Sequence, residues 1–294
     1  MKAKRLKENG GIGICSPSHI AIYDDYQNVL NGIKYFGFKS IESDDLYKNT
    51  YGYLASEIER ANDFNQLVLN DDVDLILFGG GEGGNELLPY INYDNIIKYP
   101  KLICSYSDGT YILNSIYALC NLEVYYGQMP SLFRYYNEYD LNQFKAHLMN
   151  ECHEHFSNSE WHVCHEGKCE GIMIGGYLRN FALMLNSKYM PLDLNKKYIL
   201  FLEDHEKFGG VDYVSAMLSH IEQNDFIHSV SGLIFGNYSN YLNQDLLDRL
   251  KRFGNKYNIP VIYCDDFGHG QNHAIIPIGR NATLDTKTCK LSYL

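Results

Sequence analysis

The chain has 294 residues, of which 45% are hydrophobic and 21% charged, so it can bury a substantial core as one large domain or two lobes. Its formal net charge is −11 and no stretch is strongly basic, which argues against nucleic acid or an anionic membrane surface as a partner. No apolar run approaches a membrane span, and the basic N-terminus lacks the apolar segment of a signal peptide. Eight cysteines without a secretory context are typical of reduced thiols, so we expect a cytoplasmic protein.

The first half of the chain alternates short apolar segments with amphipathic ones. A strand is predicted over residues 11–15, then a helix over 23–35 that Gly37 would end. Ser56 and Glu59 form a capping box for the next helix. Further strands are predicted over residues 73–78, 102–104 and 122–126. Strands that alternate with helices predict a parallel sheet covered on both faces.

A glycine-rich segment, residues 79–84, follows the strand predicted over 73–78. It lacks the Gly-Lys-Ser/Thr of a phosphate-binding loop, and no G-x-G-x-x-G opens a long helix. Nucleotide binding and a close approach of the backbone to a reacting carbonyl are both compatible with these glycines. Ligands bind at the carboxyl ends of parallel strands, so we expect loops 16–18, 79–86 and 105–109 to share one edge.

Ser107 stands where the strand predicted over 102–104 turns sharply into a helix. Such a turn presents a side chain at the edge of the sheet and leaves the first helical amides free to bind an oxyanion. The nucleophile-elbow pattern G-x-S-x-G is only partly met, because Ser105 stands at the first glycine. The alternative is that Ser107 or Asp108 is simply a helix N-cap.

The polar, irregular stretch at 150–160, which follows a short helix predicted over 141–149, is the best candidate for a domain boundary. We therefore expect an N-terminal lobe over residues 1–150 and a C-terminal lobe over 151–294. The fold class predicted is α/β, with a parallel-sheet sandwich first and a second α/β lobe that ends in a small β segment. In the second lobe, strands are predicted over 171–176, 198–202, 232–235 and 260–263, helices over 177–185, 212–223 and 244–257, and β structure over 274–294.

Two strands of the second half lead into reactive side chains. Glu203 follows one directly, and His269, flanked by two glycines, comes shortly after the other. Together with Ser107 they could supply a nucleophile, a base and an acid that orients the base. The alternatives are a packed or capping His269 and a Glu203 that pairs with Lys207 at the surface. Competing candidates for the orienting and proton-handling roles are Asp204, Asp265, Asp266 and His273.

Cysteine and histidine are concentrated between residues 152 and 169. Metal ligands usually come as Cys-x-x-Cys pairs, and none is present here. We therefore expect a solvated loop with scattered histidines rather than a zinc site. The residues concerned are Cys152, His153, His155, His162, Cys164, His165 and Cys169.

Six motifs occur in one order along nearly the whole chain: Ser16-Pro-Ser18, Gly80-Gly81 with Leu87-Leu-Pro-Tyr90, Pro100-Lys-Leu-Ile-Cys-Ser-Tyr-Ser-Asp108, Gly175-Gly176, Leu200-Phe-Leu-Glu-Asp204 and Gly268-His269 through Pro277-Ile-Gly279. Together they resemble the serine-peptidase family of LD-carboxypeptidases and microcin C immunity peptidases. The resemblance implies Ser107 as nucleophile, His269 as general base and Glu203 as the partner of His269. It also implies an oxyanion hole formed by the Asp108 N–H and a glycine N–H near Gly80–Gly81.

The same resemblance implies an active site in a groove between two lobes, a homodimer, and no metal or organic cofactor. The substrate expected first is a cytoplasmic muropeptide that loses its terminal D-amino acid. An aminoacyl-nucleotide antibiotic of the microcin C type is the alternative, and a non-catalytic protein that binds a small ligand on the same fold is the contrasting class.

We expect Glu82, Asn85 and Trp161 to contact the substrate. The alternative for Trp161 is a core anchor at the start of the second lobe. Two departures from the family pattern stand out. Ser105 replaces the usual glycine before Tyr-Ser-Asp, and Glu86 replaces the arginine that the carboxypeptidase branch usually has before Leu-Leu-Pro.

Overall fold

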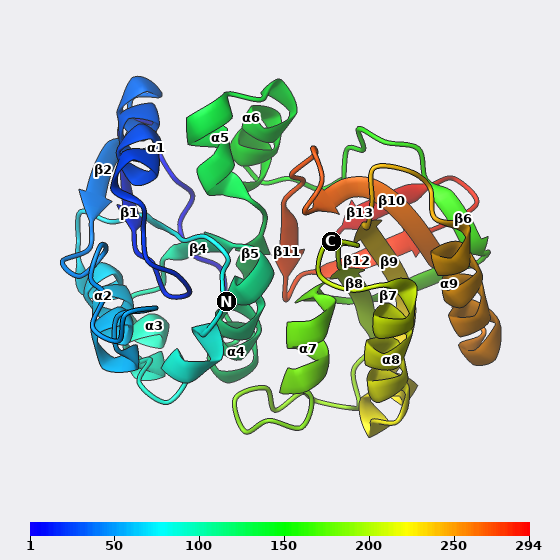
Figure 1. Ribbon diagram of the computed structural model, residues 1–294. Helices are drawn as coiled ribbons and strands as arrows, with labels where there is room; N and C mark the ends of the chain where they lie inside the picture. Colours follow the sequence, from blue (N-terminus) through cyan, green and yellow to red (C-terminus); the bar gives the residue numbers. More distant parts are fainter.

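Two β-sheets form the framework of the computed structural model, which describes residues 1–294 (Figure 1). The first sheet has the strand order β11-β5-β4-β3-β1-β2, and all its neighbouring strands are parallel except β11 and β5. Its strands are β1 (Gly11–Ile14), β2 (Lys39–Glu42), β3 (Leu75–Leu77), β4 (Leu102–Ser105), β5 (Val124–Tyr126) and β11 (Ile276–Ile278).

The second sheet has the order β13-β12-β7-β8-β9-β10-β6. Its centre, from β7 to β10, is parallel, whereas β12, β13 and β6 are antiparallel to their neighbours. Its strands are β6 (His162–His165), β7 (Lys168–Tyr177), β8 (Tyr198–Glu203), β9 (Val230–Asn237), β10 (Val261–Gly268), β12 (Asn281–Asp285) and β13 (Lys290–Tyr293).

Helices cover both faces of the first sheet, as predicted. One face packs against α1, α5 and α6, and the other against α2, α3 and α4. At the junction of the two halves α4 packs against α7, and α8 and α9 complete the second half (Figure 1). The helices are α1 (Tyr23–Tyr35), α2 (Glu57–Leu69), α3 (Tyr93–Lys98), α4 (Thr110–Cys120), α5 (Met129–Tyr135), α6 (Glu138–Phe144), α7 (Leu178–Met184), α8 (Val211–Glu222) and α9 (Gln244–Tyr257).

The α/β fold class with two sheets is confirmed, and so are most of the elements. The capping box of Ser56 and Glu59 is present, and Gly37 follows α1 with a φ of 84°. Four elements were not predicted from the sequence, namely β2, β6, α3 and α5, because they are short or half exposed and carry weak periodicity. The expected solvated loop is therefore wrong for residues 162–165, which form β6 at the edge of the second sheet, and for Cys169, which lies in β7. The helix predicted over 141–149 starts earlier, as α6, and ends in one π-helical turn, Lys145–Met149.

Strand β11 returns from near the C-terminus to the first sheet, where it pairs antiparallel with β5. Its central Pro277 lacks an N–H to donate, which a strand at the edge of a sheet tolerates. The β segment predicted over 274–294 is therefore shared between the two sheets. The division of the chain at residue 150 stays a prediction.

One large apolar cluster runs from the first sheet into the second, and a smaller one lies under α1 and α5. Ile76 and Ile103 of the first sheet belong to the same cluster as Leu200 and Ile234 of the second. The two sheets are therefore held by a continuous core rather than by a polar interface. None of the helices is both long enough and apolar enough to cross a bilayer.

Candidate active site

Ser107 occupies a strained turn between β4 and α4. Its φ is 54°, in the left-handed region that non-glycine residues rarely adopt, and Tyr106 before it is extended. Such a conformation costs about 1–3 kcal/mol and is kept where the surrounding structure enforces it. This conformation places the Ser107 hydroxyl at the carboxyl edge of the first sheet, the position predicted from the sequence for a nucleophile elbow.

Ser105, the departure from the family pattern, is accommodated by a glycine four residues later. A Cβ atom on Gly109 would lie 2.1 Å from the Ser105 Oγ and 2.7 Å from its Cβ. Ser105 is completely buried, and its Oγ has no hydrogen-bond partner. The turn therefore closes with serine at this position because Gly109 has no side chain.

His269 and Glu203 complete a hydrogen-bonded chain with Ser107. The His269 Nε2 lies 3.1 Å from the Ser107 Oγ, and the His269 Nδ1 lies 2.8 Å from the Glu203 Oε2. Glu203 is completely buried at the end of β8, whereas Ser107 is 9% exposed. The structure thus brings together three side chains that the sequence places at positions 107, 203 and 269.

The charge state of His269 depends on its carboxylate partner. Burial lowers the pKa of the imidazole, but the charge of Glu203 and its hydrogen bond outweigh burial, so the pKa is raised above 6.5. With Nδ1–H donated to Glu203, the neutral ring presents the Nε2 lone pair to Ser107. This is the tautomer that a general base needs.

A tyrosine that the sequence analysis missed links the two ends of this chain. The backbone N–H of Ser107 donates to the Tyr126 hydroxyl over 2.9 Å. That hydroxyl donates in turn to the Glu203 Oε1 over 2.5 Å. Tyr126 is the last residue of β5, next to the strand of Ser107, so its place at the end of a parallel strand was the signal available in the sequence.

The glycine-rich segment presses directly on Ser107. A Cβ on Gly80 would lie 2.6 Å from the Ser107 Cβ and 3.0 Å from its Oγ. Gly81 has a φ of 143°, and a Cβ there would lie 2.2 Å from the carbonyl oxygen of Ser18. Glycine at these two positions lets the backbone of the segment approach Ser107 and Ser18 closely. Its approach to a reacting carbonyl and nucleotide binding both stay predictions.

Asp108 fastens this segment to the turn. Its Oδ2 accepts the Gly84 N–H at 2.6 Å, and its Oδ1 accepts the side-chain amide of Asn180 at 2.9 Å. Burial raises the pKa of Asp108, while these donors act in the opposite direction. The carboxyl group is therefore a bridge between the two halves of the chain and is not free to act as a helix N-cap.

Glu86, the second departure from the family pattern, pairs with the buried guanidinium of Arg60. Arg60 also donates to the carbonyl oxygens of Pro17 and Gly83. The pair therefore holds loops 16–18 and 79–86 together beside the turn of Ser107.

A cavity of about 860 Å³ opens above Ser107 and His269. Three aromatic rings face the imidazole edge-on, with centroid distances of 6.0 Å to Tyr106, 5.5 Å to Tyr177 and 5.0 Å to Phe208. Burial lowers the pKa of His19 in the same cavity, and its Nε2 lies 2.7 Å from the Tyr26 hydroxyl. The lining residues are Ser18, His19, Ile20, Tyr53, Leu54, Gly80, Gly81, Glu82, Tyr106, Ser107, Gln128, Tyr177, Phe208, His269 and Gly270.

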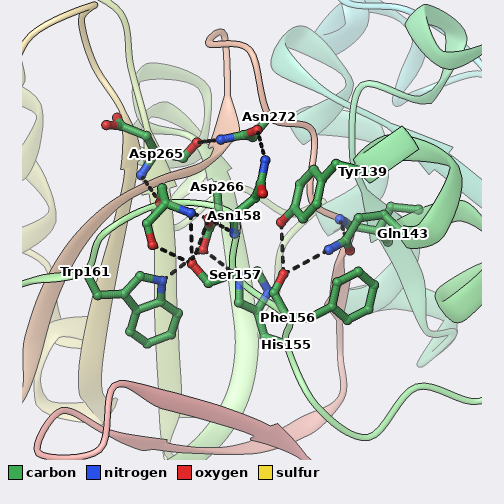
Figure 2. A network of polar contacts seen from close by, with 12 residues as sticks. Tyr139, Gln143, His155, Phe156, Ser157, Asn158, Trp161, Asp265, Asp266 and Asn272 are labelled. Atoms are coloured by element: carbon green, nitrogen blue, oxygen red, sulfur yellow. Dashed lines mark hydrogen bonds and ion pairs between the residues drawn. The ribbon is translucent and has the colours of Figure 1, made fainter. Parts of the chain in front are cut away.

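Of the three residues expected to contact the substrate, only Glu82 lines this cavity. Its carboxylate lies 3.2 Å from Arg179, with both side chains exposed. Asn85 is exposed in a short 3₁₀ turn outside the lining. Trp161 lies elsewhere, and its indole N–H donates to the Asp266 Oδ2 over 2.9 Å (Figure 2).

The competing acids and His273 lie in other networks, with one exception. Asp266 is completely buried and accepts hydrogen bonds from His155, Trp161 and residues 157–159 (Figure 2). His273 pairs with Asp140 at 2.6 Å. The exception is Asp204, which is adjacent to Glu203 in the sequence. Burial raises the pKa of Asp204 to about 7.

All eight cysteines are free, and no group of three or more His, Cys, Asp or Glu side chains is arranged to hold a metal ion.

The architecture matches that of solved structures of microcin C7 immunity proteins and their relatives. An MccF-like protein from Bacillus anthracis superposes with a TM-score of 0.89 at 25% identity, covering 100% of this chain and 99% of that one. MccF in complex with glutamyl sulfamoyl guanosine gives a TM-score of 0.87 at 25% identity, over 99% and 97% of the two chains. The fold is therefore that of the two-domain MccF-like proteins.

Sequence comparisons identify the family. The model of the LD-carboxypeptidase N-terminal domain matches residues 12–127, and that of the C-terminal domain matches residues 170–284. The chain belongs to this family of serine peptidases. Among its relatives are a Vibrio cholerae protein named as a candidate carboxypeptidase, 29% identical over 96% of this chain and 94% of that one, and the Escherichia coli microcin C7 self-immunity protein MccF, 28% identical over 93% and 90%.

Proposed function

We propose that the protein hydrolyses an amide bond through an acyl-enzyme on Ser107. The observation that carries the proposal is the continuous hydrogen-bonded chain from the Ser107 Oγ through His269 to Glu203. As the Oγ attacks the substrate carbonyl, its proton passes to the His269 Nε2, and the buried carboxylate stabilises the imidazolium. The imidazolium then protonates the leaving amine, and a water molecule repeats the sequence to release the acid.

The oxyanion hole proposed here consists of the Asp108 N–H and an N–H of Gly80 or Gly81. Two features support it. Asp108 is the residue after the nucleophile, whose amide has this role in serine hydrolases with a nucleophile elbow. Gly80 lies so close to Ser107 that its backbone borders the position where the carbonyl oxygen of the substrate would develop negative charge.

The substrate proposed first is a cytoplasmic muropeptide that loses its terminal D-amino acid, as in peptidoglycan recycling. Membership of the LD-carboxypeptidase family supports this choice. A Bacillus subtilis relative named as a murein peptide carboxypeptidase is 23% identical over 97% of the chain. We further propose, from the family resemblance, that the protein acts as a homodimer.

The second candidate is an aminoacyl-nucleotide antibiotic of the microcin C type. Solved structures of MccF hold glutamyl sulfamoyl guanosine and aspartyl sulfamoyl adenosine. In this chain the cavity carries two exposed aromatic side chains, Tyr53 at 67% and Phe208 at 57% exposure, on which a planar base could stack.

A comparison of the products formed from each compound distinguishes the two proposed substrates. The wild type and a Ser107→Ala variant are each incubated with a tetrapeptide muropeptide and with aspartyl sulfamoyl adenosine, and the products are identified by mass spectrometry. Loss of one D-amino acid from the muropeptide supports the first substrate, and release of aspartate from the adenosine derivative supports the second. Consumption by Ser107→Ala at the wild-type rate would contradict the proposed nucleophile.

A non-catalytic binding protein is the contrasting class, and a substrate-independent probe tests it. A fluorophosphonate should label the wild type at Ser107 and leave Ser107→Ala unlabelled. Ser107→Ala is expected to remain folded and to lose turnover by several orders of magnitude, the usual cost of removing the nucleophile of a triad. A wild type that neither reacts with the probe nor turns over either substrate would favour the binding protein.

A further inference from the structure

Tyr126 closes the hydrogen-bonded chain of the active site into a ring. The chain runs from the Ser107 Oγ through His269 to Glu203, and Tyr126 returns from Glu203 to the Ser107 backbone. The ring joins the two sheets, because Ser107 follows β4 and Tyr126 ends β5 in the first sheet, whereas Glu203 ends β8 in the second.

The direction of the hydrogen bonds is determined by the chemistry of the groups. The Ser107 N–H can only donate, so the Tyr126 oxygen accepts from it. The single proton of the hydroxyl is then available for the Glu203 Oε1, 2.5 Å away. Burial raises the pKa of Tyr126 well above its usual value, so the phenol keeps this proton throughout the working pH range.

The tyrosine ring is held in place by the second half of the chain. Its centroid lies 5.5 Å from that of Phe201, edge to face. A Cβ on Gly176 would approach the ring to 3.0 Å and the Thr110 Oγ1 to 2.5 Å. The glycine at 176 therefore leaves the space through which Tyr126 reaches Glu203.

We propose that Tyr126 is a positioning residue that sets the basicity of His269 through Glu203 and pins Ser107 in its strained conformation. This inference rests on the proposed role of Ser107, His269 and Glu203. A hydroxyl that donates to the Oε1 withdraws electron density from the carboxylate, which weakens the hold of the Oε2 on the imidazole proton. The bond to the Ser107 N–H fixes the peptide plane before the nucleophile and keeps its φ at 54°.

Other titratable groups also face His269, and the test must leave them unchanged. Asp204 raises the pKa of the imidazole and Lys207 lowers it. His205 interacts electrostatically with the His269 imidazole, and the rings of Tyr106 and Tyr177 contact it edge-on. Replacing Tyr126 by phenylalanine changes none of these residues and removes only one hydroxyl.

The neighbouring residue provides a matched control. Tyr125 is also buried on β5, and its hydroxyl donates to the buried Glu123 carboxylate over 2.5 Å. Glu123 pairs with Arg280 and belongs to no part of the proposed site. Tyr125→Phe therefore deletes an equivalent phenol–carboxylate bond from the same strand without touching the ring of Ser107, His269 and Glu203.

The experiment compares the wild type, Tyr126→Phe and Tyr125→Phe by NMR titration of the His269 imidazole and by the pH dependence of kcat/KM. In Tyr126→Phe we expect the midpoint of the His269 titration and the acid limb of the kcat/KM profile to move to higher pH. We also expect kcat to fall about 10- to 100-fold, the loss of a hydrogen bond to a charged group, with KM changed less than about threefold. Tyr125→Phe should match the wild type in each of these quantities.

A fluorinated tyrosine incorporated at position 126 provides a second test that keeps the side chain in place. Its more acidic hydroxyl donates more strongly, so the His269 midpoint should move to lower pH. Midpoints that stay at the wild-type value in both position-126 variants would overturn the inference. The NMR titration needs no turnover, so it decides the role of Tyr126 even if the enzyme hydrolyses neither proposed substrate, an outcome that would count only against the proposed function.

Discussion

Replacing Gly80 by alanine should disable Ser107, the proposed nucleophile, while leaving the fold intact. The added methyl group would lie 2.6 Å from the Ser107 Cβ and 3.0 Å from its Oγ. Non-bonded carbon atoms prefer about 3.5–4.0 Å, so either the loop or the serine must move by about 1 Å. A displacement of that size in a reacting group costs roughly 100-fold in rate.

The rate of covalent labelling by a fluorophosphonate measures this loss without knowledge of the substrate. We expect Gly80→Ala to label roughly 100-fold more slowly than the wild type, with its melting temperature lowered only slightly, because the change is confined to one loop. Labelling at the wild-type rate would show that the glycine segment does not press on Ser107 in solution.

Gly37→Ala provides the opposite control. Gly37 has a φ of 84° after α1, and a Cβ there would meet only the Asn9 Oδ1, at 4.0 Å. The left-handed conformation costs alanine about 1–2 kcal/mol, so this variant should lose stability. It should label at the wild-type rate, and the two glycines should thus separate loss of stability from loss of reactivity.

The remaining predictions concern titration. Glu203 raises the pKa of His269, and a general base must be neutral, so kcat/KM should rise with pH through a midpoint above 6.5. The Glu203→Gln variant should lower that midpoint. A wild-type midpoint below 6.5 would contradict the pairing of His269 with Glu203. For Asp266, burial raises the pKa, but hydrogen bonds from His155 and Trp161 outweigh it and lower the pKa from 3.8 to about 2. This depressed pKa stabilises the fold above pH 3.8 by about 2 kcal/mol, and the contribution should disappear as pH falls towards 2 in urea denaturation of the wild type. The Asp266→Asn variant should lack this pH-dependent loss of stability. The control variant Asp72→Asn, at an exposed position, should lose stability with falling pH as the wild type does.

Much of the candidate site could be predicted because it depends on local patterns. Buried strands appear as short apolar runs, and in a parallel sheet the residue that follows such a run stands at the carboxyl edge. This rule placed Ser107, Glu203 and the loop of His269 at strand ends. The glycine segment was expected near Ser107 for the same reason, and the structure has Gly80 against the serine.

The competition among the acids could not be resolved in this way. Glu203 and Asp204 are adjacent in sequence, yet the Glu203 carboxylate pairs with His269, whereas the Asp204 Oδ1 accepts the backbone N–H of His205. Asp266 lies three residues before His269, but its side chain faces the segment 155–161. Side-chain direction at a strand end depends on twist and register, which periodicity does not report.

The sequence by itself determined the alternation of strands and helices, the positions of the strand ends and the family resemblance, because each depends on residues near one another in the chain. Only the tertiary structure decided which strand ends meet. It directed Tyr126 to Glu203, brought β11 back to β5, and directed Trp161 to Asp266 instead of the cavity. These partners are 77, 150 to 154 and 105 residues apart, and packing of the continuous core, rather than any local preference, selects them.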